Sequence, residues 1–232
     1  QAEPDMPMLG AESSFVSCLR NKSFTYSVFD RLARDFNGDL FVVTEDEAKR
    51  VNSRHLTLVR RLLTGAGVSD QDPLFLWAYD FSVVPTSLIS SMYEEFYRAG
   101  TEDDSGTHYT PPELVEFVLG QALTPEVLNA APVVCDPACG SGIFLVEAFR
   151  RIVRHEAASR GRRPTSQRLK TLLLERVVGI DLNAEAIRLA AFSLYLAYLN
   201  YQTPRDIRNA GPLPRLIHRP DEDGSSGILI VA

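Results

Sequence analysis

The sequence predicts an α/β protein: a Rossmann-like parallel sheet preceded by a helical N-terminal region. Three short apolar runs rich in β-branched residues predict strands, at 132–135, 177–180 and 227–232. The first two runs lead directly into helical patterns, and alternating strands and helices are typical of parallel sheets with crossover helices. Uniformly apolar runs are typical of strands whose two faces are both covered. Because the third run closes the sequence, we expect the sheet to be incomplete, with the domain truncated after its third strand.

The remaining segments predict a tail and a helical region before the sheet. Residues 1–22 are expected to be a flexible tail, residues 23–105 the helical N-terminal region, and residues 106–232 the α/β domain. Within the helical region the apolar spacing predicts helices over 23–36, 45–63 and 86–98. The first of these carries its apolar stripe at Phe24, Val28, Leu32 and Phe36.

Composition excludes several classes of protein. The formal net charge of −6 argues against a surface that binds nucleic acid by itself, since such surfaces are normally basic. The longest apolar stretch, 189–199, is far shorter than the roughly 20 residues that cross a bilayer. Three cysteines without a Cys-x-x-Cys pair favour neither a disulfide framework nor a zinc site, and we expect a cytoplasmic, reducing environment and no metal.

The turn after the first predicted strand reads Asp-Pro-Ala-Cys-Gly-Ser-Gly, residues 136–142. Gly140 and Gly142 allow a tight turn and a close approach of the backbone to a ligand. A P-loop needs Gly-Lys, which the sequence lacks, and the dinucleotide fingerprint needs a third glycine that is absent here. Asp136 would repel a pyrophosphate but attract an ammonium or sulfonium group, so the turn predicts a ligand with a positive end.

Asp181 ends the second predicted strand, where a carboxylate can accept hydrogen bonds from both hydroxyls of a ribose. Asn183 is placed to cap the next helix. The stretch from Gly142 to Asp181 exceeds the roughly 20 residues of a dinucleotide-binding unit, and its segment 150–163, with six arginines and one glutamate, predicts a helix extension and loop. That segment is either a solvated helix face or a DNA contact. The predicted ligand is a ribonucleoside with a positive or zwitterionic end.

A third element lies upstream, at Tyr109 and Thr110. Thr110 and Glu113 have the spacing of a capping box, and Pro111 takes the first helical position that proline favours. These residues would therefore be held at a helix start, where they could line a pocket.

Three segments resemble, in order, motifs of the N6-adenine DNA methyltransferases of restriction–modification systems. They are HYTPPELVEFVL, DPACGSGIFLVEAF and VVGIDLNAEAIRLAAFSLYL, and the likeness is closest to type I modification subunits and fused restriction–methylation enzymes. The resemblance implies the SAM-dependent methyltransferase fold and S-adenosyl-L-methionine (SAM) as cofactor. Asp181 would hold the ribose hydroxyls and Leu182 would lie against the adenine. The residues that it implies around the methionine and ribose are Tyr109, Thr110, Asp136, Gly140, Ser141 and Gly142.

The sequence departs from this family in its catalytic motif. The family needs Asn or Asp, followed by two prolines and an aromatic residue. Asn-Pro does not occur in this sequence. Thr110–Glu113 has the two prolines but lacks the amide and the aromatic residue, and Asp72–Phe75 lacks the second proline. We assign no catalytic residue and expect this chain alone to be inactive. Double-stranded DNA would bind through parts outside the chain, and specificity or restriction subunits could be partners. The alternatives are a methyltransferase acting on a protein or small molecule, and a SAM-binding scaffold without catalysis.

Overall fold

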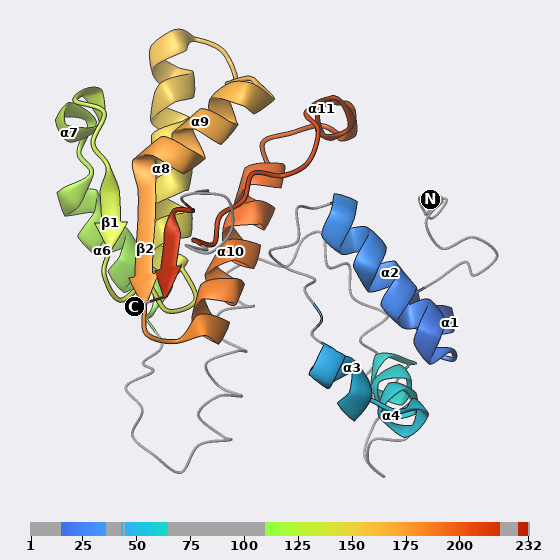
Figure 1. Cartoon of the computed structure of the whole chain (residues 1–232). Coiled ribbons are helices and arrows are strands. Elements are labelled where there is room, and N and C mark those ends of the chain that lie inside the picture. Colours follow the sequence, from blue (N-terminus) through green and yellow to red (C-terminus); the bar gives the residue numbers. More distant parts are fainter. Residues whose placement is uncertain (1–14, 36–42, 44, 65–109, 219–226, 232) are drawn as a thin grey trace. The chain divides into compact units, whose positions relative to one another are not determined.

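The computed structural model describes residues 15–35, 43, 45–64, 110–218 and 227–231. The chain divides into two compact units, Gln1–Val84 and Pro85–Ala232 (Figure 1). Among the described residues, no helix has both the length and the apolar character needed to span a membrane.

The described part of the first unit is helical. Its helices are α1 (Phe15–Cys18), α2 (Lys22–Asp35), α3 (Glu45–Arg50) and α4 (Ser53–Thr64). The described part of the apolar stripe predicted for α2 is confirmed, because Val28 is buried with Cys18 and packs beside Phe24 and Leu32. The fourth residue of the stripe, Phe36, lies outside the described residues. Since α1 contributes the fully buried Cys18, packed structure begins inside the segment that we expected to be a tail.

The single helix predicted over 45–63 is wrong, because the chain forms α3 and α4 with a break at Val51 and Asn52. The Asn52 side-chain oxygen accepts from the backbone N–H groups of Arg54 (2.9 Å) and His55 (3.3 Å), which starts a new helix. The restart buries Leu56, whereas Leu58 and Leu62 are exposed. The helix predicted over 86–98 lies outside the described residues.

The second unit contains a three-stranded parallel sheet in the order β1-β2-β3 among the described residues (Figure 1). Its elements are α6 (Pro112–Ala122), α7 (Pro125–Asn129), β1 (Val134–Asp136), α8 (Ile143–Arg160), α9 (Ser166–Arg176), β2 (Val177–Asp181), α10 (Ala184–Leu199), α11 (Pro204–Asn209) and β3 (Leu229–Val231). The predicted parallel α/β architecture is confirmed, with three strands where three apolar runs predicted them. In register, Asp136 lies beside Gly179, and Asp181 lies beside Val231.

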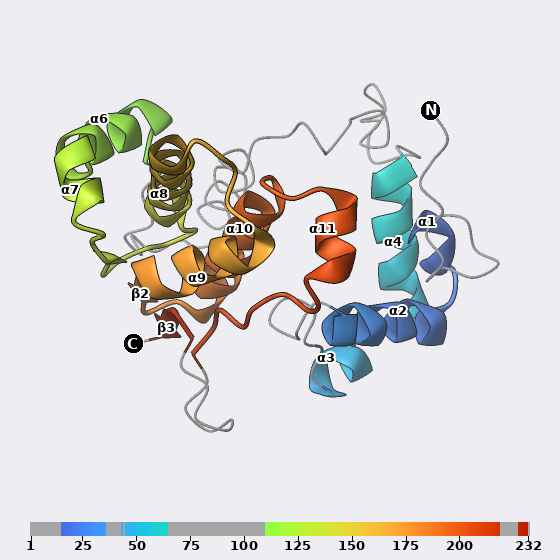
Figure 2. The same cartoon turned by 90° about the horizontal axis from the view of Figure 1, so that it is seen from above.

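The helices that follow β1 and β2 cover the same face of the sheet (Figure 2). On that face Gly179 has no room for a side chain, since a Cβ there would lie 2.5 Å from the Leu145 Cδ1 atom. On the other face Val178, Ile180 and Ile230 are only half-buried. The described helices therefore cover one face, not the two that the apolar strands predicted.

Helix α10 forms the centre of this unit. It packs against α8, α9, β2 and β3, and its buried residues occur on several sides of the helix. The sequence of 189–199 agrees with this, because it is apolar except for Ser193 and a helix that is apolar all round needs cover on more than one side. At the end of this core the Tyr195 hydroxyl donates to the Pro214 carbonyl over 2.7 Å, which fixes the segment that leads to β3.

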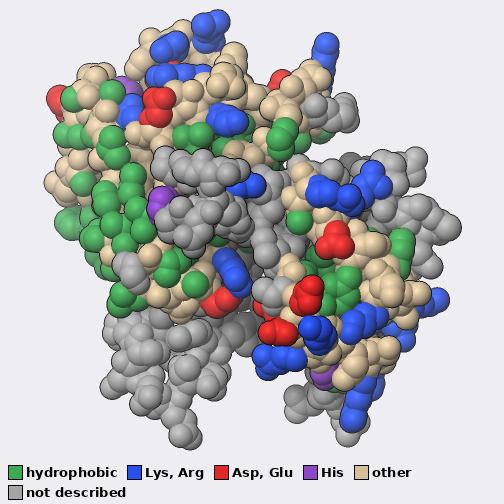
Figure 3. All heavy atoms as spheres, viewed as in Figure 1, with side chains coloured by type: hydrophobic (Ala, Val, Ile, Leu, Met, Phe, Trp, Pro, Cys, Tyr) green, Lys and Arg blue, Asp and Glu red, His purple; other side chains and the backbone are tan. Residues whose placement is uncertain are grey.

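Strand β1 has a neighbour on one side only among the described residues. Val133, directly before it, is 59% exposed, and Cys135 within it is exposed. Hydrophobic side chains gather over this side of the unit in Figure 3. Phe117 of α6 and Val127 of α7 are exposed. An open strand edge beside apolar surface favours pairing with another chain.

We therefore expect the chain to self-associate as its concentration rises, and Val133→Lys to reduce this association because edge lysines oppose strand pairing. Light scattering over a concentration series measures the effect. Val59→Lys, the same change at an exposed valine of α4 in the first unit, serves as the control. A monodisperse monomer at high concentration would contradict the expectation.

Candidate functional site: two loops at the carboxyl ends of the strands

The glycine-rich turn of 136–142 joins β1 to α8 at the carboxyl end of the sheet. Gly140 and Gly142 have φ values of +51° and +85°, in the left-handed region that favours glycine. A Cβ at Gly142 would lie 2.9 Å from the Cβ of Ala190, so the turn rests directly on α10. Gly140 differs, because the space beside it is open. The turn is thus fixed at Gly142 and accessible at Gly140.

Asp181 connects this turn to the loop after β2. Its Oδ2 atom accepts from the Gly140 backbone N–H over 2.8 Å, and its Oδ1 atom accepts from the Asn183 N–H over 2.8 Å. The Cys139 N–H also donates to the Ile180 carbonyl, at 2.9 Å. The two loops that were predicted to share a ligand are therefore hydrogen-bonded to each other. No sequence motif predicted this contact.

Asp136 lies half-buried at the start of the turn. Its Oδ1 atom accepts from the Ala138 N–H at 3.1 Å. Burial raises the pKa of the Asp136 carboxyl above its ordinary value, the Ala138 hydrogen bond opposes this rise, and the negative charge of Asp181 adds to it. Two acidic side chains therefore face the same small region, which favours a positively charged group there.

The loop after β2 presents Leu182 at its surface. Leu182 is 84% exposed, an unusual position for a leucine held between two ordered elements. Asn183 caps α10, as predicted, because its side-chain oxygen accepts from the N–H groups of Glu185 and Ala186. Ser141, by contrast, is 2% exposed and offers a ligand little surface.

The capping box predicted at Thr110 is wrong. Helix α6 begins at Pro112, its N-cap is Pro111, and no side chain caps it. The residue before a proline is driven to extended backbone, and Pro111 accordingly has φ −56° and ψ 140°, which excludes it from the helix. Thr110 lies half-buried one residue further out. Tyr109 lies outside the described residues, as does the Asp72–Phe75 segment.

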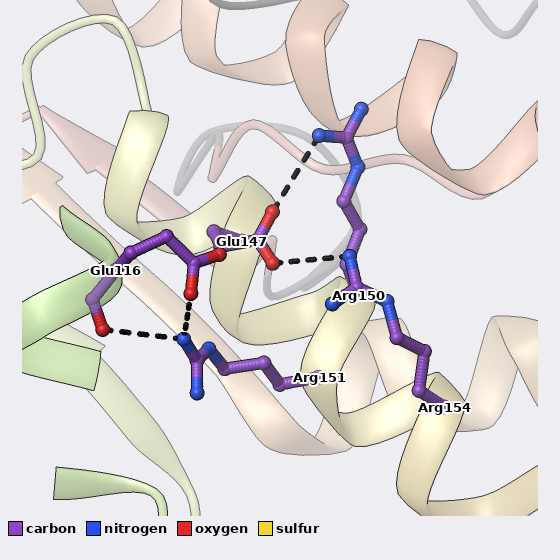
Figure 4. Close-up of polar contacts among 5 residues, drawn as sticks. All are labelled: Glu116, Glu147, Arg150, Arg151 and Arg154. Carbon is purple, nitrogen blue, oxygen red and sulfur yellow. Dashed lines mark hydrogen bonds and ion pairs between the residues drawn. The ribbon is translucent and has the colours of Figure 1, made fainter. Parts of the chain in front are cut away.

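Much of the arginine-rich stretch predicted over 150–163 forms the second half of α8. Glu147 lies between Arg150 and Arg154, with ion-pair distances of 3.5 and 3.1 Å (Figure 4). Arg151 reaches across to α6, where it donates to the carbonyl and the carboxylate of Glu116. No sequence pattern predicted this connection between α6 and α8.

The end of the same stretch turns a corner into α9. Glu156 pairs with Arg160 at 2.6 Å and with Arg168 at 2.8 Å, and these arginines lower the pKa of the Glu156 carboxyl. Arg162 and Arg163 make no ion pair in the described part of the chain. The predicted helix extension and loop is confirmed, and most of its arginines bind carboxylates of this chain.

The cysteines near the turn differ in exposure, since Cys135 is exposed and Cys139 is buried. Burial, together with the charges of Asp136 and Asp181, raises the pKa of the Cys139 thiol to about 12. Because the thiolate is the reactive form, we expect a thiol reagent at pH 8 to modify Cys135 long before Cys139 or the buried Cys18. Mass spectrometry of the labelled peptides measures this order.

Cys135→Ser is the matched control for the thiol prediction, and it should abolish the fast phase of labelling. Equal labelling rates at Cys135 and Cys139 would show that the turn opens readily and would contradict the packed geometry described above.

Residues 127–212, which hold both loops, match the family model described as MmeI, DNA-methyltransferase domain. The predicted resemblance to adenine methyltransferases of restriction–modification systems is confirmed. The adenine-specific methyltransferase PglX of Streptomyces coelicolor (strain ATCC BAA-471 / A3(2) / M145) is 28% identical over 136 residues. That alignment covers 57% of this chain and 11% of the PglX sequence, so the chain spans a small part of its curated relative.

The segment that matches the methyltransferase model spans most of the described elements of the second unit. It covers β1, α8, α9, β2, α10 and α11, and begins within α7. Thr110 and α6 lie outside the matched segment.

Proposed function

We propose that the chain binds SAM and forms the cofactor-binding part of a DNA methyltransferase that modifies adenine at N6. The observation that carries the proposal is the Asp181 carboxylate, which holds the Gly140 turn while Leu182 beside it stays exposed. A carboxylate at the end of the second strand suits a ribose, and an exposed apolar side chain next to it suits a nucleobase.

The residues present fit SAM in charge and in space. Asp136 and Asp181 favour its sulfonium and ammonium groups, and the open side of Gly140 leaves room for close approach. Ser141 and Gly142 would shape the turn on the side that faces away from the ligand. Tyr109 and Thr110 would border the methionine. When bound, SAM supplies a methyl group activated by the sulfonium charge.

The acceptor is assigned from the relatives. The MmeI family model describes a DNA-methyltransferase domain, and PglX is named as adenine-specific. We propose double-stranded DNA as the substrate, within restriction–modification or phage defence in the cytoplasm, with specificity or restriction subunits as candidate partners. The arginines of α8 are engaged with Glu116, Glu147 and Glu156, which favours DNA binding through parts outside this chain.

Calorimetric titration tests the cofactor assignment. SAM and S-adenosylhomocysteine should bind, whereas NAD and ATP should not, because the turn has neither the third glycine nor the lysine that their phosphates need. Binding of ATP as tight as that of SAM would overturn the assignment.

A second assay tests catalysis separately. Purified chain mixed with labelled SAM and unmodified DNA should transfer no methyl group, because its sequence has no Asn/Asp-Pro-Pro-aromatic motif to hold the target amine. Labelled DNA would contradict this expectation without affecting the cofactor assignment.

A further inference from the structure

Helix α6 rests on the part of α8 that follows the glycine-rich turn. Val115 and Leu119 of α6 are buried in one cluster with Ala148 of α8, and Ile143, the first residue of α8, packs against that cluster. Because Ile143 directly follows Gly142, the apolar contacts of α6 reach the end of the turn itself. The position of α6 is therefore tied to the candidate site by packing.

The first turn of α6 lies at the same end of the sheet as the two loops. Figure 1 shows α7 beyond the amino end of β1 and α6 beside the arrowhead of that strand. Only Leu123 and Thr124 separate α6 from α7. The end of α6 therefore lies toward α7, and its start lies toward the loops.

Thr110 follows the position of α6 closely. The Pro111 carbonyl accepts from the N–H groups of Leu114 at 3.0 Å and Val115 at 3.2 Å, which joins the residue next to Thr110 to the first turn of the helix. Pro111 and Pro112 also have fixed φ angles, so the backbone here has little freedom. A shift of α6 would therefore carry Thr110 with it.

Arg151 supplies a polar connection between α6 and α8 (Figure 4). Its Nη2 atom donates to the backbone carbonyl of Glu116 at 3.2 Å and also to the Glu116 carboxylate. Because one of the two acceptors is a main-chain carbonyl, the contact holds the backbone of α6 as well as a side chain. Arg154, about one turn further along α8, binds Glu147 of its own helix instead.

The burial of Arg151 is poorly explained by stability alone. Its side chain is only 19% exposed, and its Nε atom is buried without a hydrogen-bond partner among the described residues. An unsatisfied buried donor costs free energy, and apolar replacements of buried ion pairs are often neutral or stabilising. Glu116 is 58% exposed and would stay hydrated without its partner. Arg151 therefore fits a role in holding α6 in place better than a role in stabilising the fold.

Given the proposed function, on which this step rests, we propose that Arg151 is a positioning residue of the SAM site. It fixes the start of α6 and thereby keeps Thr110 beside the glycine-rich turn, where the methionine of SAM binds. The ribose and adenine are assigned to Asp181 and Leu182, at the end of β2 and directly after it. Arg151 should therefore affect the binding of the methionine end and leave the binding of the nucleoside unchanged.

Calorimetric titration of the full chain with SAM and with adenosine tests the proposal. Arg151→Met removes the link and should weaken SAM binding about three- to tenfold, the loss expected for one hydrogen bond to the methionine. Adenosine, which has no methionine, should bind within about twofold of its affinity for the parent. Arg151→Lys should restore part of the SAM affinity, since an ammonium group can still reach one Glu116 acceptor. Arg154→Met, the same change on the same helix, is the matched control and should leave SAM binding unchanged.

A double-mutant cycle shows whether Arg151 acts through Thr110. In a Thr110→Val background, Arg151→Met should weaken SAM binding by less than about twofold, because the contact with the methionine is already lost. Urea denaturation of Arg151→Met should show a stability equal to or above that of the parent, which a residue with only a structural role would not give.

The outcomes distinguish the positioning role from the proposed function. If the parent binds SAM and Arg151→Met binds it equally well, or if SAM and adenosine weaken together, the positioning role is wrong and the SAM assignment stands. The positioning role is also wrong if Arg154→Met weakens SAM as much, or if the losses at Arg151 and Thr110 simply multiply. A parent chain that binds no SAM overturns the proposed function and the positioning role with it.

Discussion

Replacing Asp181 with alanine should weaken SAM binding by roughly ten- to a hundredfold, more than any other single side-chain change. The carboxylate is expected to accept from the ribose hydroxyls, and hydrogen bonds to charged groups are worth about 1.5–3 kcal/mol, where about 1.4 kcal/mol is a factor of ten. It also holds the Gly140 N–H and the Asn183 N–H. Calorimetric titration with SAM measures the loss. Asp181→Asn should be milder, since its side chain retains one acceptor oxygen.

The matched control for this change is Glu185→Ala. Glu185 is an exposed carboxylate in the first turn of α10 that pairs with Arg188, so its removal changes local charge but no loop contact. Hydrogen exchange at the Gly140 amide separates the two roles of Asp181, because exchange reports the loop contact even without ligand. If Asp181→Ala binds SAM as the parent does, the assignment of the pocket is wrong.

Gly142→Ala should destabilise the second unit by about 2 to 5 kcal/mol. Its φ of +85° strains a residue with a side chain by about 1–2 kcal/mol. The added Cβ would also lie 2.9 Å from the Ala190 Cβ and 3.0 Å from its Cα, and overpacking of this kind costs about 1–3 kcal/mol. Urea denaturation followed by circular dichroism measures the loss.

Gly161→Ala isolates the backbone part of that cost. Gly161 ends α8 with a φ of +62°, and a Cβ there would meet nothing within 4 Å. Its substitution should therefore cost only the strain, about 1–2 kcal/mol. Similar losses at Gly142 and Gly161 would show that the turn does not press on α10 as described.

Local chemistry explains which parts of the fold could be predicted from sequence. Strands β2 and β3 could be predicted from their apolar runs. The Asn183 cap of α10 could be predicted from the residue type alone. The failures occurred where two local signals competed. Asn52 interrupts a helical pattern by capping a new helix, and the second of two prolines excludes Pro111 from α6.

The candidate site was predictable in its residues but not in its contacts. Periodicity and motif placed Asp136, Gly140 and Asp181 at the ends of neighbouring strands. The bond from Gly140 to Asp181 joins residues 41 positions apart, and it depends on how β1 and β2 align. The half-buried face of the sheet that includes Ile180 was predicted to be covered. An apolar run predicts that a strand is buried, but it does not indicate which element of the chain covers each face.

The corner between α8 and α9 has a consequence for folding kinetics. Gly161 ends one helix, Thr165 starts the next, and Glu156 binds Arg168 only 12 positions away. Contacts between residues this close in sequence form early. The pairing of β1 with β2 is slower, because it joins two strands separated by the whole of α8 and α9. We expect the helical corner to form first and to bring the two strand sequences within reach, which lowers the entropic cost of closing the long connection.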